Sequence, residues 1–326
     1  MSSIARDEKS GWRRAGSLRA PGIADVRLWL ADWLQGRELL GVERLPGGLM
    51  NRNCRLRVAG SPDVVLRLYD RNPSAAAKER TILELLTGEL PVPKVLYAND
   101  QAARPFLILE WIDGRSLFDI KRADDRDAMA ALAHEAGLLL ARLQTHRFDR
   151  CGLLTQTLAV HATGLPDPPS TAALVEFFAR SAAFRSRVGA GVAQRLLAAV
   201  RDWDDRPRAP LLPATLVHGD FNTRNLLVRR DVGRWSVAAI LDWEFAFAGP
   251  LYCDIGSFLR YERADYPRFE PAFSRGLRDG GVPLEGDWLG AARMADLPAL
   301  CELLARDSTP EDVAAEVAEL ISRAMT

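Results

Sequence analysis

The first third of the chain alternates short apolar runs with glycine-, proline- and aspartate-bearing turns, which is typical of a small β-sheet. Residues 23–36, before these runs, repeat apolar residues at three- and four-residue steps and predict an amphipathic helix. Strand-like runs then flank two turns, at Gly47-Gly48 and at residues 60–63. We expect these runs to pair as antiparallel strands, because short turns can join only antiparallel neighbours.

One helical segment interrupts these strands. Residues 74–88 have helical spacing, with Ser74 at the start, where a capping residue is favoured, and Gly88 at the end. Two further extended runs follow, and the second ends in an Asp-Gly turn at residues 113–114.

From residue 116 onward the pattern changes to long helical repeats. Ala, Leu and Arg recur at helical spacing over residues 125–147 and 171–204, with a loop that contains Pro and Gly between them. Two apolar runs, 226–230 and 234–241, flank the turn RDVG and predict a β-hairpin. Helical patterns then continue to the C-terminus.

These patterns predict three parts of the chain. Residues 1–20 form a flexible polar arm, residues 21–113 an N-terminal lobe, and residues 114–326 a larger C-terminal lobe. The predicted fold class is α+β, with a small antiparallel sheet and one main helix in the first lobe. The second lobe is mostly helical and carries the hairpin.

The composition is ordinary for a globular enzyme, with 48% apolar and 26% charged residues among 326. The formal net charge is zero, so charge gives no reason to expect a nucleic-acid or membrane partner. The first 20 residues contain no apolar run long enough for a signal peptide or an anchor. No feature of the sequence implies an obligate protein partner.

The four cysteines, Cys54, Cys151, Cys253 and Cys301, are widely spaced and form no C-x-x-C pair. This spacing argues against a zinc site and against a disulfide framework. It favours free thiols in a reducing compartment, so we expect a cytoplasmic protein.

The segment LVHGDFNTRNLLV, residues 216–228, places several polar side chains between two apolar pairs. An apolar core does not tolerate such groups without partners. Folding the hairpin about its turn brings Asn225, at the start of one strand, close to Asp242, at the end of the other. Asp220 enters from the preceding loop, so two carboxylates and an amide oxygen are expected to converge.

Oxygen ligands of this kind suit Mg²⁺, which usually takes one or two carboxylates and completes its shell with water and phosphate. Asn225 and Asp242 are the candidate metal ligands. Asp220 would then be free to accept a proton from an attacking hydroxyl. Phosphoryl transfer needs little more, because its catalysis consists mainly of positioning and charge neutralisation. Taken singly, Asp220 and Asn225 could instead be an ordinary turn residue and a strand cap.

HGDFNTRN followed by ILDWE resembles the catalytic and metal-binding segments of the aminoglycoside phosphotransferase and choline kinase superfamily. The resemblance implies a bilobal protein-kinase-like fold, with Asp220 as the catalytic base and Asn225 and Asp242 as ligands of Mg²⁺. It also implies that His218 braces the catalytic loop and that Asp254, in CDIGSFLR, supports this loop by hydrogen bonding.

The likeness extends from about residue 24 to residue 258, and its upstream part concerns the nucleotide. The family pairs a helix glutamate with a strand cation that binds phosphate, and LPGGLMN resembles the family's nucleotide loop. The nucleotide-binding residues implied in this way are Gly47, Gly48, Asn51, Arg67, Glu79, Glu110 and Ile112. The implied donor is ATP, with GTP left open. The two glycines could also serve only a tight turn, and Glu79 could be a solvated helix residue.

Two positions depart from the family pattern. The family cation is often lysine, whereas this chain has Arg67, a planar fork in place of a point charge. A general drift toward arginine is the alternative, since the chain has only four lysines. A regulated protein kinase has arginine before its catalytic aspartate, where this chain has Gly219, and no phosphorylatable loop is evident over residues 242–254. We therefore expect a small-molecule kinase.

The predicted reaction is transfer of the γ-phosphoryl group of ATP to a hydroxyl of a small polar molecule. Residues 251–326, which in the family usually line the acceptor site, hold fourteen acidic and eight basic residues. This balance favours a cationic acceptor such as an aminoglycoside, an amino sugar or an amino alcohol, although a solvated helical face could carry the same charges. Two alternatives stay open: a nucleotide-binding pseudokinase regulator, and a hydrolase metal centre of His218, Asp220, Asp242 and Asp254.

Overall fold

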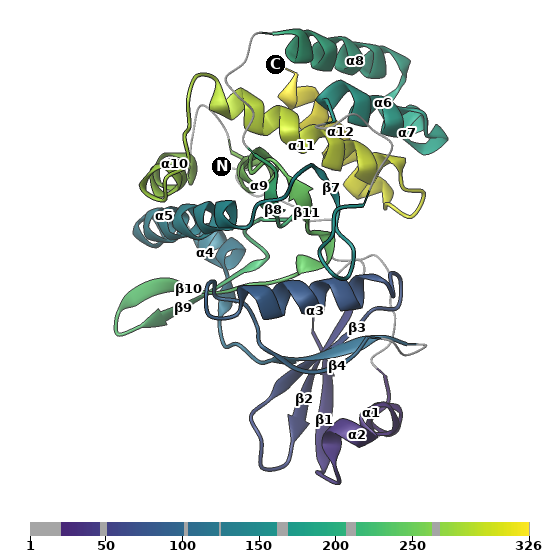
Figure 1. The fold of residues 1–326 in the computed structure, drawn as a ribbon, viewed down its shortest axis with the longest axis vertical. Helices are drawn as coiled ribbons and strands as arrows, with labels where there is room; N and C mark the ends of the chain where they lie inside the picture. The colour runs from purple at the N-terminus through teal and green to yellow at the C-terminus, as the bar shows by residue number, and fades with distance from the viewer. Residues whose placement is uncertain are drawn as a thin grey trace.

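The computed structural model describes residues 21–45, 51–100, 104–123, 125–161, 169–206, 213–262 and 268–325. These residues form a five-stranded antiparallel sheet followed by a larger, mostly helical part, which confirms the predicted α+β class (Figure 1). The predicted arm over residues 1–20 lies outside the described residues.

The sheet has the strand order β1-β2-β3-β5-β4. Its strands are β1 Leu39–Arg44, β2 Arg52–Val58, β3 Val64–Leu68, β4 Val95–Asn99 and β5 Phe106–Glu110. Successive side chains of β5 face opposite sides: Ile108 packs with the helices that precede the sheet, and Leu107 and Leu109 pack with α3 (Ala75–Leu86). Both faces are covered, which explains why β5 is apolar without alternation.

The predicted N-terminal helix is interrupted once. It forms α1 (Ile23–Trp29) and α2 (Ala31–Leu34), with Leu30 between them at φ −103°. The Leu30 amide still donates to the Val26 carbonyl at 3.0 Å, and the Leu30 carbonyl accepts from the Leu34 amide at 2.7 Å. The buried apolar face of this segment therefore runs across the break.

Helix α3 lies between the sheet and the helical part of the chain (Figure 1). It begins after Ser74 as predicted, but the expected side-chain cap is absent, because the Ser74 hydroxyl donates to Asn72 Oδ1 at 2.8 Å. Beyond its C-terminal end Gly88 adopts φ +89°, a conformation that favours glycine.

The helical part follows β5. Its α-helices are α4 Leu117–Ala123, α5 Arg126–Arg142, α6 Thr171–Ala179, α7 Ala182–Val188, α8 Ala190–Asp205, α9 Tyr252–Leu259, α10 Glu270–Asp279, α11 Trp288–Ala305 and α12 Glu311–Ala324. Two 3₁₀ turns are η3 Leu143–Thr145 and η4 Trp243–Phe245, and the short strands are β6 Arg115–Ser116, β7 Gly152–Leu153, β8 Thr215–Val217 and β11 Phe247–Gly249. No helix within the described ranges is long and apolar enough to cross a membrane.

The helical repeat over residues 171–204 forms three helices rather than one. Ser181 starts α7, where its hydroxyl accepts from the Phe184 amide at 3.4 Å. Gly189 separates α7 from α8 with φ +77°, which lies outside the helical region. The apolar spacing continues across both breaks, so periodicity alone does not reveal them.

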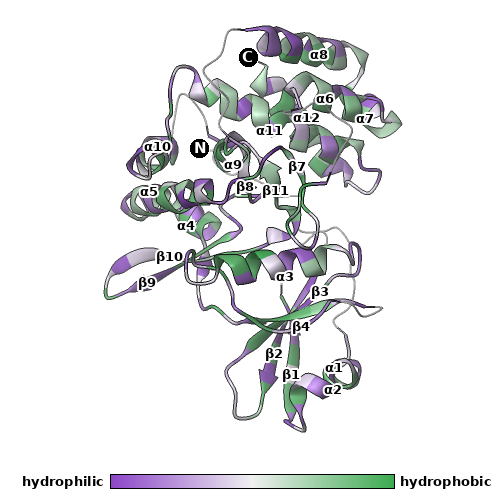
Figure 2. Ribbon diagram, in the orientation of Figure 1, coloured by the Kyte–Doolittle hydropathy of each residue, from purple (hydrophilic) through white to green (hydrophobic). Residues whose placement is uncertain are grey.

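The predicted hairpin consists of β9 (Leu226–Asp231) and β10 (Arg234–Ile240). Ile240 pairs with Leu226, and the Leu241 amide donates to the Asn225 carbonyl at 2.8 Å. This register confirms that Asn225 and the end of β10 are neighbours. The tip of the hairpin is hydrophilic, whereas its base joins the main hydrophobic core (Figure 2).

Glycines allow two close helix crossings in the helical part. Gly137 of α5 lies against the Phe273 carbonyl of α10, and Gly256 of α9 lies against the Ala292 carbonyl of α11. A Cβ atom at either glycine would overlap the opposite carbonyl oxygen. These helices are therefore held at backbone contact distance.

Candidate active site

The loop between β8 and β9 carries His218, Gly219 and Asp220. Its start is held by Asp254, in the first turn of α9, whose carboxylate accepts the amides of His218 at 2.6 Å and Gly219 at 2.9 Å. Asp254 is fully buried, and burial raises its pKa to about 7 against the opposing effect of these amide donors. The predicted hydrogen-bond support of the loop by Asp254 is thus present.

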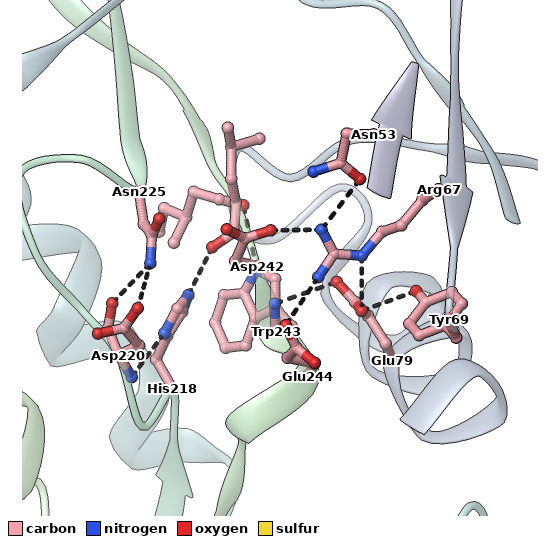
Figure 3. Close-up of polar contacts among 12 residues, drawn as sticks. Asn53, Arg67, Tyr69, Glu79, His218, Asp220, Asn225, Asp242, Trp243 and Glu244 are labelled. Atoms are coloured by element: carbon pink, nitrogen blue, oxygen red, sulfur yellow. Dashed lines mark hydrogen bonds and ion pairs between the residues drawn. The ribbon is translucent and has the colours of Figure 1, made fainter. Parts of the chain in front are cut away.

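His218 joins this loop to the hairpin. Its Nε2 donates to the Leu241 carbonyl at 2.8 Å, and its Nδ1 accepts the Asp220 amide at 3.2 Å (Figure 3). These partners fix a neutral imidazole with the proton on Nε2. Burial lowers the pKa of His218, which agrees with that state.

The Asp220 carboxylate is half-buried and oriented by two amides. Asn225 Nδ2 donates to its Oδ2 at 2.9 Å, and Asn222 Nδ2 donates to its Oδ1 at 2.8 Å. Asn222 was not among the predicted site residues, although its place two positions after Asp220 is typical of an Asx side chain that bonds locally. The carboxylate therefore has a fixed direction.

Gly219 has a steric reason to be glycine. Its φ is +81°, and a Cβ atom there would lie 2.5 Å from the Phe245 carbonyl oxygen. A side chain in this position, such as the arginine of regulated protein kinases, does not fit this loop.

The second half of the site surrounds Arg67 of β3. Its Nε donates to Glu79 Oε2 of α3 at 3.0 Å, so the predicted ion pair is present and buried (Figure 3). Its Nη1 donates to Asp242, and its Nη2 lies 3.5 Å from Glu244 Oε1. The Tyr69 hydroxyl donates to Glu79 Oε2 at 2.7 Å. One guanidinium thus connects the sheet, α3 and the end of the hairpin.

Carboxylates outnumber cations in this Arg67 cluster. Lys78 is the other nearby cation, and it donates to the Ala246 carbonyl at 2.9 Å. Burial raises the pKa of Glu79, and burial raises that of Glu244 to about 8, in each case against the effect of Arg67. Glu244 and Tyr69 were not predicted as site residues, because nothing local in the sequence distinguishes them from core-flanking residues.

Asp242 lies between the Arg67 cluster and the Asp220–Asn225 pair (Figure 3). Its backbone is left-handed, with φ +64°, an uncommon conformation that Asp tolerates. The Asn225 amide nitrogen is used by Asp220, so its carbonyl oxygen points away from that carboxylate. One amide oxygen and one carboxylate in an acidic cluster are suitable donors for Mg²⁺.

The other predicted nucleotide-binding residues have different outcomes. Gly47 and Gly48 lie outside the described residues. Asn51 is buried next to Glu244, and its side chain lowers the pKa of that carboxyl against the larger effect of burial. Glu110 ends β5, where its amide donates to the Lys94 carbonyl at 2.9 Å, and Ile112 follows half-buried.

The geometry does not favour a hydrolase metal centre. Both ring nitrogens of His218 are engaged, and Asp254 faces backbone amides rather than the other carboxylates. No group of three or more His, Cys, Asp or Glu side chains in the described ranges is arranged to hold a metal.

A cleft of about 1710 Å³ opens beside the catalytic loop. Residues of α3, β7, α6, α9 and α11 line it, and it reaches Gly219 and Glu244. It therefore adjoins both Asp220 and the Arg67 cluster, and it is large enough for a molecule of several rings.

Comparisons with known proteins agree with this arrangement. The sequence model described as "Phosphotransferase enzyme family" matches residues 41–294. A search of curated proteins finds no match to the chain.

Several solved structures share the fold. The GDP complex of wild-type aminoglycoside 2'-phosphotransferase-IIIa has a TM-score of 0.70 at 18% identity, over 94% of this chain and 99% of that one. Aminoglycoside phosphotransferase APH(4)-Ia has a TM-score of 0.64 at 17% identity, over 93% and 98%. A putative fructosamine-3-kinase from Thermobifida fusca YX-ER1 has a TM-score of 0.62 at 18% identity, over 93% and 100%. The predicted resemblance and the predicted bilobal kinase-like fold are confirmed.

Proposed function

The chain belongs to the phosphotransferase enzyme family, and from that premise we propose that it transfers the γ-phosphoryl group of ATP to a hydroxyl of a small, polar, cationic molecule. The observation that carries the proposal is the Asp220 carboxylate, which two amides orient and which follows directly after Gly219, a residue that lines the open cleft. A carboxylate so placed can accept the proton of an acceptor hydroxyl, a step that typically contributes about 10²–10⁴-fold to the rate.

We assign the phosphate end of the nucleotide to the Arg67 cluster. Arg67 is held by Glu79, and its Nη2 makes only a long ion pair with Glu244, at 3.5 Å, so this nitrogen can turn its donor to a phosphate oxygen. Asn225 and Asp242 would hold Mg²⁺, and the excess of carboxylates around Arg67 supports a divalent cation there. When bound, Mg²⁺ neutralises charge on the transferred phosphoryl group.

ATP is the proposed donor, and the related structures support a purine nucleotide. Variants of APH(4)-Ia form ternary complexes with ADP or AMP-PNP and hygromycin B, and aminoglycoside 2'-phosphotransferase-IIIa binds GDP. GTP is therefore the donor to compare with ATP. In this proposal Gly47, Gly48 and Asn51 contact the phosphates, and the backbone of Glu110 and Ile112 contacts the base.

The acidic side chains of the cleft support a cationic acceptor. Acidic residues that line it include Glu285 and Asp287, next to the start of α11. All four cysteines are free thiols in the structure, which supports the proposed reducing, cytoplasmic location.

The test is ADP release from purified protein with MgATP or MgGTP, across aminoglycosides, other basic antibiotics, amino sugars and amino alcohols. Asp220→Asn is the matched control, because it keeps the size of the side chain and removes its basicity. We expect acceptor-dependent release that the variant loses while nucleotide still raises its melting temperature. If nucleotide raises the melting temperature and no acceptor stimulates release, the result favours the pseudokinase alternative or an acceptor outside the panel. Absence of nucleotide binding contradicts the proposal.

A further inference from the structure

One wall of the cleft exposes large apolar side chains. Leu153 of β7 is 63% exposed and Phe177 of α6 is 58% exposed, and both line the cleft. The Phe177 ring packs edge-on against Phe178, with centroids 5.2 Å apart, so one side of it is supported. Exposed apolar surface that faces a cleft is unfavourable in water, and a ligand with an apolar face would cover it.

A carboxylate without a protein partner lies at another part of the cleft. Glu285 is exposed and makes no hydrogen bond or ion pair with the residues that the structure describes. It is close enough to Tyr252 of α9 to raise the pKa of that phenol, together with burial as the larger cause. Glu285 and Tyr252 both line the cleft, and a carboxylate and an aromatic ring on one cleft lining are a favourable environment for an organic ammonium group.

The basic side chains that line the cleft are already engaged. Arg306 pairs with Glu302 at 2.6 Å, Arg206 pairs with Asp202, and Lys78 donates to the Ala246 carbonyl. The charge that the cleft offers a ligand near Glu285 is therefore the negative charge of that carboxylate.

A third observation independently indicates a ligand. The Ser257 hydroxyl of α9 lines the cleft, is only 4% exposed, and has no hydrogen-bond partner in the described part of the chain. Buried hydroxyls are nearly always bonded, so this one is suited to a polar atom of a bound molecule.

We propose that the acceptor is a cationic amphiphile, a hydroxyl compound whose ammonium group binds at Glu285 and Tyr252 and whose apolar group packs on Leu153 and Phe177. Phe177 and Glu285 are the specificity-determining residues of this site. The inference rests on the proposed function, because the acceptor hydroxyl must reach Asp220. It changes the expected acceptor from a uniformly polar molecule to one with a large apolar face.

The test uses a series in which only the apolar part grows: ethanolamine, N-butylethanolamine and N-octylethanolamine. ADP release gives KM for each compound, and the melting temperature of the MgADP-loaded protein reports binding without turnover. We expect KM to fall, and the thermal shift to grow, with chain length. Phe177→Ser should raise KM for the octyl compound about tenfold and leave ethanolamine unchanged. Leu28→Ser is the matched control, because Leu28 is 77% exposed on α1 and does not line the cleft.

The ammonium site is tested with a neutral partner of similar length, 2-(octyloxy)ethanol. The wild type should bind N-octylethanolamine more tightly than 2-(octyloxy)ethanol. Glu285→Gln should lower the ratio of the two affinities about fivefold to tenfold. Glu319→Gln on α12 is the matched control for loss of one exposed carboxylate outside the cleft.

The outcomes separate this inference from the proposed function. Turnover with no dependence on chain length, or a Phe177→Ser effect equal for all three compounds, overturns the inference and leaves the kinase assignment intact. Binding that grows with chain length, without ADP release from any acceptor, supports the amphiphile site and contradicts the kinase assignment. If none of the compounds changes the melting temperature, the inference is wrong.

Discussion

The two halves of the active site are built in different ways. In the Asp220 loop, side chains accept hydrogen bonds from amides, and most of the partners lie within residues 218–225. Around Arg67, one guanidinium faces carboxylates that lie 12 and 175 residues away in the sequence. The first half is a local network of hydrogen bonds, and the second is a buried charge cluster that joins distant segments.

This difference determines how each half responds to substitution. A hydrogen bond to a carboxylate contributes about 1.5–3 kcal/mol, and at a half-exposed site such as Asp220 water can partly replace a lost donor. A buried charge that loses its partner has no such compensation, and the cost is about 3–5 kcal/mol. The Arg67 cluster should therefore dominate stability, whereas the Asp220 loop should dominate the chemical step.

The largest expected effect is that of Arg67→Met. The variant leaves Glu79, Asp242 and Glu244 facing one another, so we expect the free energy of unfolding to fall by about 3–5 kcal/mol at pH 8. The loss should be smaller at pH 6, because the Glu244 carboxyl, whose pKa burial raises to about 8, is protonated there and the repulsion is relieved. Urea denaturation at the two pH values measures both numbers. Arg67→Lys is the control, because it keeps the positive charge. If Arg67→Met lost less than about 1 kcal/mol at pH 8, the carboxylates around Arg67 would not depend on its charge.

Gly219→Ala should have the next largest effect, now in the hydrogen-bonded half. The new methyl group meets the Phe245 carbonyl at a positive φ, so we expect a loss of about 2 kcal/mol or more and a strong decrease in turnover. Gly233→Ala is the matched control, since Gly233 has φ +80° with nothing within 4 Å and should cost only about 1 kcal/mol. Equal melting temperatures for the two variants would contradict the steric explanation.

Asn222→Ala tests the orientation of the base. The variant removes one of two amides on the half-buried Asp220 carboxylate, so stability should fall by about 1–2 kcal/mol, less than for the Arg67 cluster. Turnover should fall about tenfold, with KM for the nucleotide unchanged, because the carboxylate gains rotational freedom. Steady-state kinetics separates the two parameters, and a change confined to the nucleotide KM would place Asn222 in the other half of the site.

The smallest effect concerns pH. Burial lowers the pKa of folded His218 below 6.5, so the folded state binds fewer protons than the unfolded state just below that pH. Its contribution to the free energy of unfolding is therefore complete above pH 6.5 and decreases as the pH falls through that value. His218→Asn, which keeps an acceptor for the Asp220 amide but does not titrate, should show a shallower loss of stability from about pH 7 to pH 5. Identical slopes for variant and wild type would mean that His218 is protonated already in the folded state.

The sequence predicted the local half of the site well. The turn RDVG sets the register near the tip of the hairpin, and a β-bulge between Val237 and Ala239 shifts it by one residue, so Leu241 meets Asn225. The end of β10 lies beside Asn225 in spite of this shift. Periodicity also predicted α3. It failed at Leu30, Ser181 and Gly189, where helices break although the apolar spacing continues. Glu244 and Tyr69 could not be predicted as site residues, because their roles depend on contacts with Arg67 that form only in the folded chain.

The contact between Gly256 and the Ala292 carbonyl has an evolutionary consequence. It fixes α9, which carries Asp254 and Ser257, against α11. The helix that supports the catalytic loop and the two helices that line the cleft are therefore coupled. A descendant that acquires a new substrate cannot widen this cleft by sliding the two helices apart without losing the loop as well. Its selectivity must change instead through single replacements at the rim, at positions such as 153, 177 and 285, and the phosphate chemistry would be inherited unaltered.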